Sequence, residues 1–407
     1  MKNPLLTTSR DGLILFSTRI VRLFAYGFLS VVLALYLAQV GLSESAVGGL
    51  FTWTLLGDAG ISLWVTTSAD RIGRKRMLLL SSGLMIFAGA VFALTGNFIA
   101  LTVAAIVGVI SPSGNEIGPF LSIEQAALTQ IVPGRSRTRV FAWYNLAGSL
   151  ATATGSLASG LLAQMLQAHG STPLESYRVI VIGYAAIGLV LVALFSLLSS
   201  GVEALQAPRV RSRLGLHRSR GVVLHLSALF SLDAFAGGFI VQSLVAYWFQ
   251  IRWGLQPAAL GGVFFGANIL AGISALTAAR IAARIGLINT MVYTHIPSNL
   301  LLMLVPVMPT LPLAILVLLV RFSISQMDVP TRQSYTMAVV DPDERSAASG
   351  VTTIARSLGA AWSPWLTGIL FQRMLLSAPF FFSGGLKIAY DLLVYRSFRA
   401  LKPPEEI

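Results

Sequence analysis

Twelve apolar runs, each about 20 residues long or longer, divide this sequence and limit what it can fold into. The chain has 407 residues, of which 55% are hydrophobic and only 11% are charged. A soluble globular chain has about 25% charged residues, so this chain has too few to cover a water-exposed surface. The sequence therefore predicts a polytopic membrane protein and excludes an ordinary cytosolic enzyme.

We expect the runs to be helices rather than the strands of a barrel, because they are long and lack strict alternation of apolar and polar residues. The predicted fold is thus an all-α membrane protein with twelve transmembrane helices. The predicted spans are 14–40, 46–68, 77–95, 98–131, 140–166, 176–199, 221–250, 258–279, 287–307, 311–338, 346–371 and 378–395.

The basic residues indicate how these spans are oriented. With a cytoplasmic N-terminus, the cytoplasmic segments hold 20 of the 29 Lys and Arg residues and the outer loops hold three, Arg178, Arg252 and Arg373. Cytoplasmic loops of membrane proteins carry such an excess of positive charge. We therefore expect a multi-pass protein of the cell inner (cytoplasmic) membrane with both termini in the cytoplasm. The net charge of +13 is then a topology signal that also attracts anionic lipid head groups.

Several other classes of function are excluded by what the sequence contains. Its positive charge lies between apolar runs, so nucleic-acid binding is not expected. The chain has no cysteine and only four scattered histidines, so we expect neither a disulfide framework nor a metal site. We find no phosphate-binding loop and no nucleophile–base–acid set, so no cofactor, catalytic residue or enzymatic activity is predicted.

The two halves of the chain resemble each other. Residues 40–51 pair with 253–264, and offsets of 208 to 213 persist from there to the pair Gly160/Gly368. A constant offset indicates an internal duplication rather than a packing motif. We predict two pseudo-symmetric six-helix bundles, residues 1–199 and 221–407, joined by a cytoplasmic basic linker at 200–220. Parallel repeats of this kind are typical of transporters whose site lies between the halves near mid-membrane.

The loop after the second predicted span carries a motif, Asp70-Arg71-Ile72-Gly73-Arg74-Lys75. It resembles the signature loop of the major facilitator superfamily, although Thr66 and Ser68 replace the usual Gly and Leu at its start. The resemblance extends over the whole chain and implies the fold of that superfamily. It also implies a cytoplasmic gating role for Asp70, Gly73 and Arg74, with Arg71 in the same motif, and no direct role in binding substrate.

Charged residues inside the spans are the candidate substrate and proton sites, because each costs about 2.5–3.5 kcal/mol near the bilayer centre on insertion scales. In span 4, residues 111–119 contain two prolines and two glycines, which predict a broken helix lining protein or a water cavity. Glu116 lies on this break, and Glu124 follows two turns later. Either could carry a proton, or both could be neutralised by Arg321 or Arg332.

The remaining candidates are Asp58, Arg22 and Asp233. Asp58 could pair with Arg22 on the preceding span, as structure or as part of coupling. The repeat aligns Glu124 with Arg332, so an ion pair between the halves, exchangeable or fixed, is also expected. Lys387 and Asp391 lie four residues apart on one helix and are expected to pair with each other.

The leading hypothesis is a monomeric secondary active transporter that moves a small organic solute by alternating access, coupled to protons. Efflux of drug-like compounds is one form of it. The alternative is a carrier for an organic anion or metabolite that uses the buried arginines. A transport-dead membrane receptor or scaffold ranks below both, and a channel is disfavoured by the duplication. Substrate and direction of transport stay open.

Overall fold

The computed structural model describes residues 9–115, 118–132, 137–203, 218–341 and 344–399. The described residues form two compact units: the first combines Met1–Pro208 with Gln242–Phe265, and the second combines Arg209–Val241 with Gly266–Ile407. Residues 242–265, which belong to the second predicted bundle, have most of their contacts in the first unit, and the division into two six-helix bundles stays a prediction. Most of the predicted linker, 204–217, lies outside the described residues.

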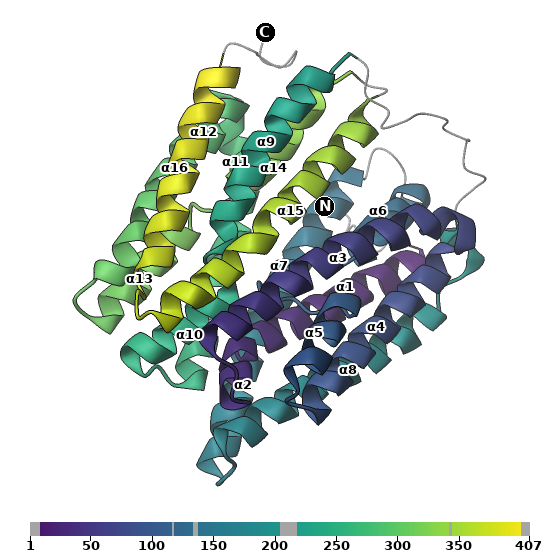
Figure 1. Ribbon diagram of the computed structural model, residues 1–407. Helices are drawn as coiled ribbons and strands as arrows, with labels where there is room; N and C mark the ends of the chain where they lie inside the picture. The colour runs from purple at the N-terminus through teal and green to yellow at the C-terminus, as the bar shows by residue number, and fades with distance from the viewer. Residues whose placement is uncertain (1–8, 116–117, 133–136, 204–217, 342–343, 400–407) are drawn as a thin grey trace. The chain divides into compact units, whose positions relative to one another are not determined.

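All of the regular structure in the described residues is helical (Figure 1). The helices of the first unit are α1 Arg10–Ser30, α2 Leu33–Gln39, α3 Glu44–Ile72, α4 Arg74–Leu94, α5 Phe98–Val107, α6 Phe120–Ile131, α7 Arg137–Ala168, α8 Pro173–Ser196, the short 3-10 helix η3 Ser200–Val202, and α10 Gln242–Trp253. Those of the second unit are α9 Arg220–Gly238, α12 Leu287–Leu304, the 3-10 helix η4 Val305–Val307, α13 Leu311–Phe322, α14 Asp328–Ala338, α15 Arg345–Gln372 and α16 Ala378–Phe398. Helix α11, Pro257–Ile285, runs from the first unit into the second.

Four of the predicted spans are each made of two helices. These broken spans are α1 with α2, α5 with α6, α9 with α10, and α13 with α14. They are the first and fourth predicted spans of each half, so the breaks repeat along the chain as the sequence duplication does. The break of span 4 was predicted, and Gly114 and Gly118 on it have φ of +68° and +79°, which glycine adopts without steric cost.

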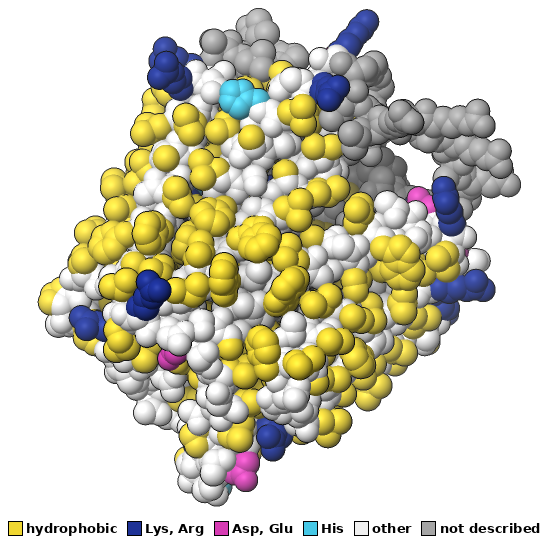
Figure 2. Space-filling model, in the orientation of Figure 1, with side chains coloured by type: hydrophobic (Ala, Val, Ile, Leu, Met, Phe, Trp, Pro, Cys, Tyr) yellow, Lys and Arg dark blue, Asp and Glu magenta, His cyan; other side chains and the backbone are white. Residues whose placement is uncertain are grey.

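The surfaces of the helices are those of a protein in contact with lipid. In the described residues, eight helices or helix pairs are long and apolar enough to cross a membrane, and the face seen in Figure 2 is covered mainly by hydrophobic side chains. Large apolar side chains such as Trp64 and Leu189 are more than half exposed. Exposed apolar surface of this extent marks a membrane-facing protein.

In each unit, the helix of the first predicted span packs closely on that of the fifth through glycines. A Cβ atom built on Gly27 of α1 would lie 2.1 Å from the carbonyl oxygen of Thr152 on α7, and one on Gly155 of α7 would lie 2.1 Å from that of Phe24. In the second unit, a Cβ on Gly238 of α9 would lie 2.4 Å from the carbonyl oxygen of Ala360 on α15. Small residues allow helix backbones in membranes to approach in this way.

Replacing Gly155 by Val is therefore expected to destabilise the protein by about 1–3 kcal/mol, because its side chain would push α7 away from α1. The matched control is Gly83→Val on α4, where nothing lies within 4 Å of the added Cβ. Thermal unfolding of both purified variants in detergent checks this. Equal unfolding temperatures for the two would contradict the close approach of α1 and α7.

Candidate functional site

The first buried charge cluster is built around Glu124 of α6. Both the Glu124 and the Arg22 side chains are fully buried, and the guanidinium of Arg22 on α1 donates two parallel hydrogen bonds to the carboxylate, at 2.6 and 2.7 Å. The hydroxyl of Tyr144 on α7 donates a third, and the Thr18 hydroxyl lies 3.0 Å both from the carboxylate and from the carbonyl oxygen of Leu15. Arg22 and Tyr144 satisfy both oxygens of the carboxylate, so this cluster joins α1, α6 and α7.

The other candidates of the first unit are Asp58 and Glu116. Asp58 lies half-buried on α3 and accepts a hydrogen bond of 3.2 Å from Ser62, one turn further along the helix. Its pairing with Arg22 stays a prediction. Glu116, the leading candidate of the sequence analysis, lies outside the described residues.

The second cluster is built around Asp233 of α9 and contains three cations. Lys387 of α16 donates to one carboxylate oxygen at 2.7 Å, while Arg356 of α15 and Arg332 of α14 donate to the other at 2.9 and 3.0 Å. Arg332 also binds Asp328, one turn earlier on α14, at 2.9 Å. The expected pairing of Lys387 with Asp391 is wrong, because the long lysine side chain reaches Asp233 on the neighbouring helix.

Glu124 and Arg332 thus each have ion-pair partners within their own unit. The repeat alignment had suggested a pair between these two residues, but alignment gives only the level of a residue along its span. Which face of a helix a side chain occupies decides its partner, and that depends on helix rotation. For Glu124 the partner is Arg22, on a helix of the same unit.

Asp391 belongs to a third polar group that the sequence analysis missed. Its carboxylate lies 2.8 Å from Nδ1 of His295 on α12 and accepts a hydrogen bond of 3.3 Å from the side-chain amide of Asn299. All three side chains are buried, with residue exposures of 1%, 4% and 0%. The signal available in the sequence was the polar pair His295 and Asn299, one turn apart in an apolar run, with Pro297 between them.

Arg321 differs from the other arginines of the second unit. It lies at the end of α13, beside the break of span 10, and is only 8% exposed. Among the described residues it has no salt-bridge partner, and its buried Nε has no hydrogen-bond acceptor. A buried polar group left without a partner costs about 1–3 kcal/mol, and more when it is charged.

The motif loop is held together within the first unit. Gly73 separates α3 from α4 with a φ of +116°, and Asp70 accepts a hydrogen bond of 2.9 Å from Nε of Arg74. Arg74 also donates to the side chain of Gln130 at 3.1 Å and to the carbonyl of Val202 at 3.2 Å.

Two further residues of the loop region differ in burial and contacts. Glu203, which the sequence analysis did not single out, accepts a hydrogen bond of 2.7 Å from the backbone N–H of Arg74 and so caps the first turn of α4. Arg71 is exposed.

The broken spans, the buried charge clusters and the motif loop are features of a multi-pass membrane transporter. The family model of the Major Facilitator Superfamily matches residues 15–364, which is most of the chain. The protein belongs to this superfamily of secondary transporters and has its fold. Its substrates are therefore small molecules bound in the membrane.

Three relatives each align with more than nine-tenths of the chain. The uncharacterized membrane protein YJR124C of Saccharomyces cerevisiae is 29% identical, over 95% of this chain and 93% of its own length. The multidrug efflux protein YfmO of Bacillus subtilis is 25% identical, over 92% of this chain and 89% of its own. The transcription regulatory protein OpdE of Pseudomonas aeruginosa is also 25% identical, over 99% and 97%.

Among solved structures, the nucleoside transporter NupG superposes with a TM-score of 0.74 at 14% sequence identity, over 96% of this chain and all of the other. At this identity the likeness concerns the fold alone.

Removing one partner of the Glu124 pair is expected to destabilise the protein more than removing both. Arg22→Met leaves a buried carboxylate without its cation, which costs about 3–5 kcal/mol. Adding Glu124→Gln to Arg22→Met is expected to restore most of that loss, because no unpaired charge remains. Thermal unfolding of the single and double variants measures this. A double variant as unstable as the sum of the two singles would show that the groups do not interact.

Two arginines of the motif loop, Arg74 and Arg71, are expected to differ in how much they stabilise the protein. Arg74→Ala removes three hydrogen bonds of a buried guanidinium and is expected to destabilise the protein by about 1–3 kcal/mol. Arg71→Ala removes an exposed side chain, and such changes are usually within about 0.5 kcal/mol. Unfolding temperatures in detergent compare the two. A loss for Arg71→Ala as large as that for Arg74→Ala would contradict the described packing of the loop.

Proposed function

We propose that this protein is a proton-coupled secondary transporter of a small organic solute that carries an acidic group. The observation on which this rests is Arg321, a buried arginine that makes no salt bridge in the described part of the chain and interacts with the carboxylate of Asp328 only beyond salt-bridge distance. A cation in low dielectric needs a counter-charge. A carboxylate or phosphate group of the solute supplies it.

Two other buried arginines support this proposal by contrast. Arg22 donates to Glu124, and Arg332 donates to Asp233 and Asp328. Each of these two arginines has a carboxylate partner on its own unit, so it does not need a ligand as its counter-charge. Arg321 also lies at a helix break, and broken helices in membranes are tolerated where they line protein or a water-filled cavity.

Export of drug-like cations is the second candidate, and the name of the relative YfmO favours it. A lipophilic cation requires a buried acid that is free to accept it. In the described residues, Glu124 and Asp233 are each held by at least one cation at 3.0 Å or less. The buried charges therefore favour an anionic solute over a cationic one.

We further propose that the carrier works as a monomer in the inner (cytoplasmic) membrane, with both termini in the cytoplasm. The 20-to-3 distribution of Lys and Arg between the predicted cytoplasmic and outer segments supports this orientation. Asp58 and Glu116 stay candidates for coupling, and the motif loop at Asp70–Arg74 stays the candidate gating element.

A thermal-shift screen of the purified protein distinguishes the two candidates. The anions are lactate, benzoate and glucuronate, and the lipophilic cations are tetraphenylphosphonium and ethidium. A ligand at 100 times its dissociation constant stabilises by about 2.7 kcal/mol. We expect an anion to raise the unfolding temperature of the wild type and to lose this effect in Arg321→Gln.

The matched control is Arg252→Gln, which changes an arginine of a predicted outer loop that lies beside the ring of Trp253. It is expected to respond to anions as the wild type does. Stabilisation by the cations alone, or an anion effect that persists in Arg321→Gln, would contradict the proposal.

A further inference from the structure

The side chains of α12 and α16 form a buried polar seam in the second unit. His295 and Asp391 lie at its centre, 2.8 Å apart. From Asp391 the seam continues along α16 to Lys387 and Ser383, each one turn earlier, and Lys387 in turn binds Asp233 of α9. Histidine is the side chain whose ordinary titration falls between about pH 5 and 8, and a carboxylate partner makes it a proton-binding group.

Several buried oxygen atoms near this pair have no hydrogen-bond partner among the described residues. They are the hydroxyls of Ser298, Ser383 and Tyr390 and the side-chain oxygen of Asn299. The two helices approach closely here, since a Cβ on Gly384 would lie 2.9 Å from the carbonyl oxygen of Asn299. Pro297 lacks an N–H and so leaves a carbonyl of the preceding turn unbonded. Unsatisfied polar atoms grouped in this way are the usual partners of buried water.

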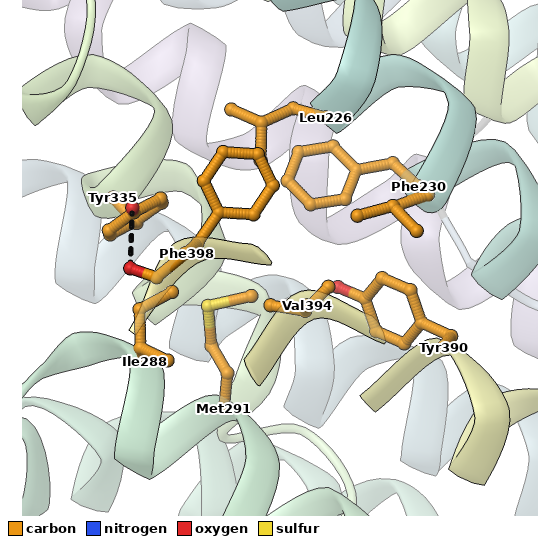
Figure 3. Packing of buried hydrophobic residues seen from close by; sticks show 9 residues of the cluster. Leu226, Phe230, Ile288, Met291, Tyr335, Tyr390, Val394 and Phe398 are labelled. Carbon is orange, nitrogen blue, oxygen red and sulfur yellow. Dashed lines mark hydrogen bonds between the residues drawn. The ribbon is translucent and has the colours of Figure 1, made fainter. Parts of the chain in front are cut away.

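An apolar cluster adjoins the pair along both helices, since Met291 precedes His295 by one turn on α12 and Tyr390 and Val394 flank Asp391 on α16. Figure 3 shows this buried cluster, to which Phe230 of α9 and Phe398 of α16 also belong. The ring of Tyr390 lies edge-on to that of His295, with centroids 6.2 Å apart. The cluster occupies the end of the unit where α9 begins and α16 ends. The seam is thus polar toward one end of the helices and closed by apolar side chains toward the other.

The charged side chains around the pair belong to one connected group. Three carboxylates (Asp233, Asp328 and Asp391) face three cations (Arg332, Arg356 and Lys387), and a fourth cation, Arg321, interacts electrostatically with Asp328. These residues and His295 come from α9, α12, α13, α14, α15 and α16, and Tyr390 is the other titratable side chain beside the pair. One more proton, taken up by the imidazole or the carboxylate, raises the net charge of the group by one.

We propose that His295 and Asp391 form the proton-binding pair of this carrier, and that a proton bound there increases its affinity for an anionic solute. The second part rests on the proposed function, since it assumes an anion that binds at Arg321 of the same unit. In a medium of low dielectric, the bound proton stabilises the bound anion, and the anion stabilises the bound proton. By linkage, the anion therefore increases proton affinity by the same factor as the proton increases anion affinity.

The first test observes the pair directly, without a substrate. The protein is labelled with 15N-histidine, and the imidazole signals are followed in detergent from about pH 5 to 8. The chain contains four histidines, so the signal lost in His295→Gln identifies His295. We expect His295 to change its protonation state in this range, with a midpoint that moves by at least one pH unit in Asp391→Asn.

The matched control is His225→Gln, which changes a histidine of α9 that lies against Phe398. It is expected to leave the titration of His295 unchanged. A His295 signal that does not change between pH 5 and 8, or one that titrates identically in Asp391→Asn, would overturn the assignment of the pair. If His295→Gln fails to fold, the comparison of the wild type with Asp391→Asn still decides the question.

The second test measures linkage with lactate, benzoate and glucuronate, which are ionised at both pH 6 and pH 8. The dissociation constant of the anion that binds, taken from thermal shifts, is expected to be at least fivefold lower at pH 6 than at pH 8 in the wild type. This difference should disappear in Asp391→Asn. Equal affinities at both pH values in the wild type would overturn the linkage. If none of these anions binds, the proposed function fails, while the 15N titration still decides whether the pair binds a proton.

Discussion

The cost of placing a charge in hydrocarbon determines how this protein is built. Insertion scales put it at about 2.5–3.5 kcal/mol per residue, and the chain carries charged residues in the middle of its spans. The structure offsets this cost by grouping opposite charges on neighbouring helices. Arg22 and Glu124 join α1 to α6 in the first unit, and Asp233 joins α9 to α14, α15 and α16 in the second. Each cluster is closed within its own unit.

Closed clusters suit the proposed mechanism of alternating access. The ion pairs stabilise each unit internally, so they persist as long as the unit itself stays folded. Glycines also hold each unit together. Gly27 lets α1 approach α7 closely in the first unit, and Gly238 lets α9 approach α15 in the second. Arg321, which makes no salt bridge among the described residues, is the group that we propose binds the solute.

The sequence predicted the class of protein well because the membrane imposes simple rules. Apolar runs, the motif at Asp70–Arg74 and the repeat offsets led to the superfamily, and the family model confirms it. The break of span 4 was also foreseen, since Pro112, Gly114 and Pro119 disrupt a helix. The break between α1 and α2 was not, because residues 31 and 32 are both valine and carry no such signal.

The partners of the buried charges could not be derived from the sequence. Lys387 was assigned to Asp391 by the rule for residues four apart on a helix, but a lysine side chain is long enough to reach Asp233 on α9. Asp391 instead contacts His295, which was considered only as a metal ligand and set aside. The partner of a buried charge depends on the rotation of its helix and on neighbours from other parts of the chain. The spacing of residues along one helix gives no information on either.

The central claim, that this protein moves an anionic solute at the expense of a proton gradient, is tested most directly by flux into proteoliposomes. The measurement is the uptake of radiolabelled lactate, benzoate and glucuronate by vesicles that contain the purified protein, with and without a pH gradient across the membrane. The account predicts that uptake of at least one anion saturates with concentration, depends on the gradient and is lost in Arg321→Gln. Uptake no greater than in protein-free vesicles, or uptake that rises linearly and ignores the gradient, would contradict it.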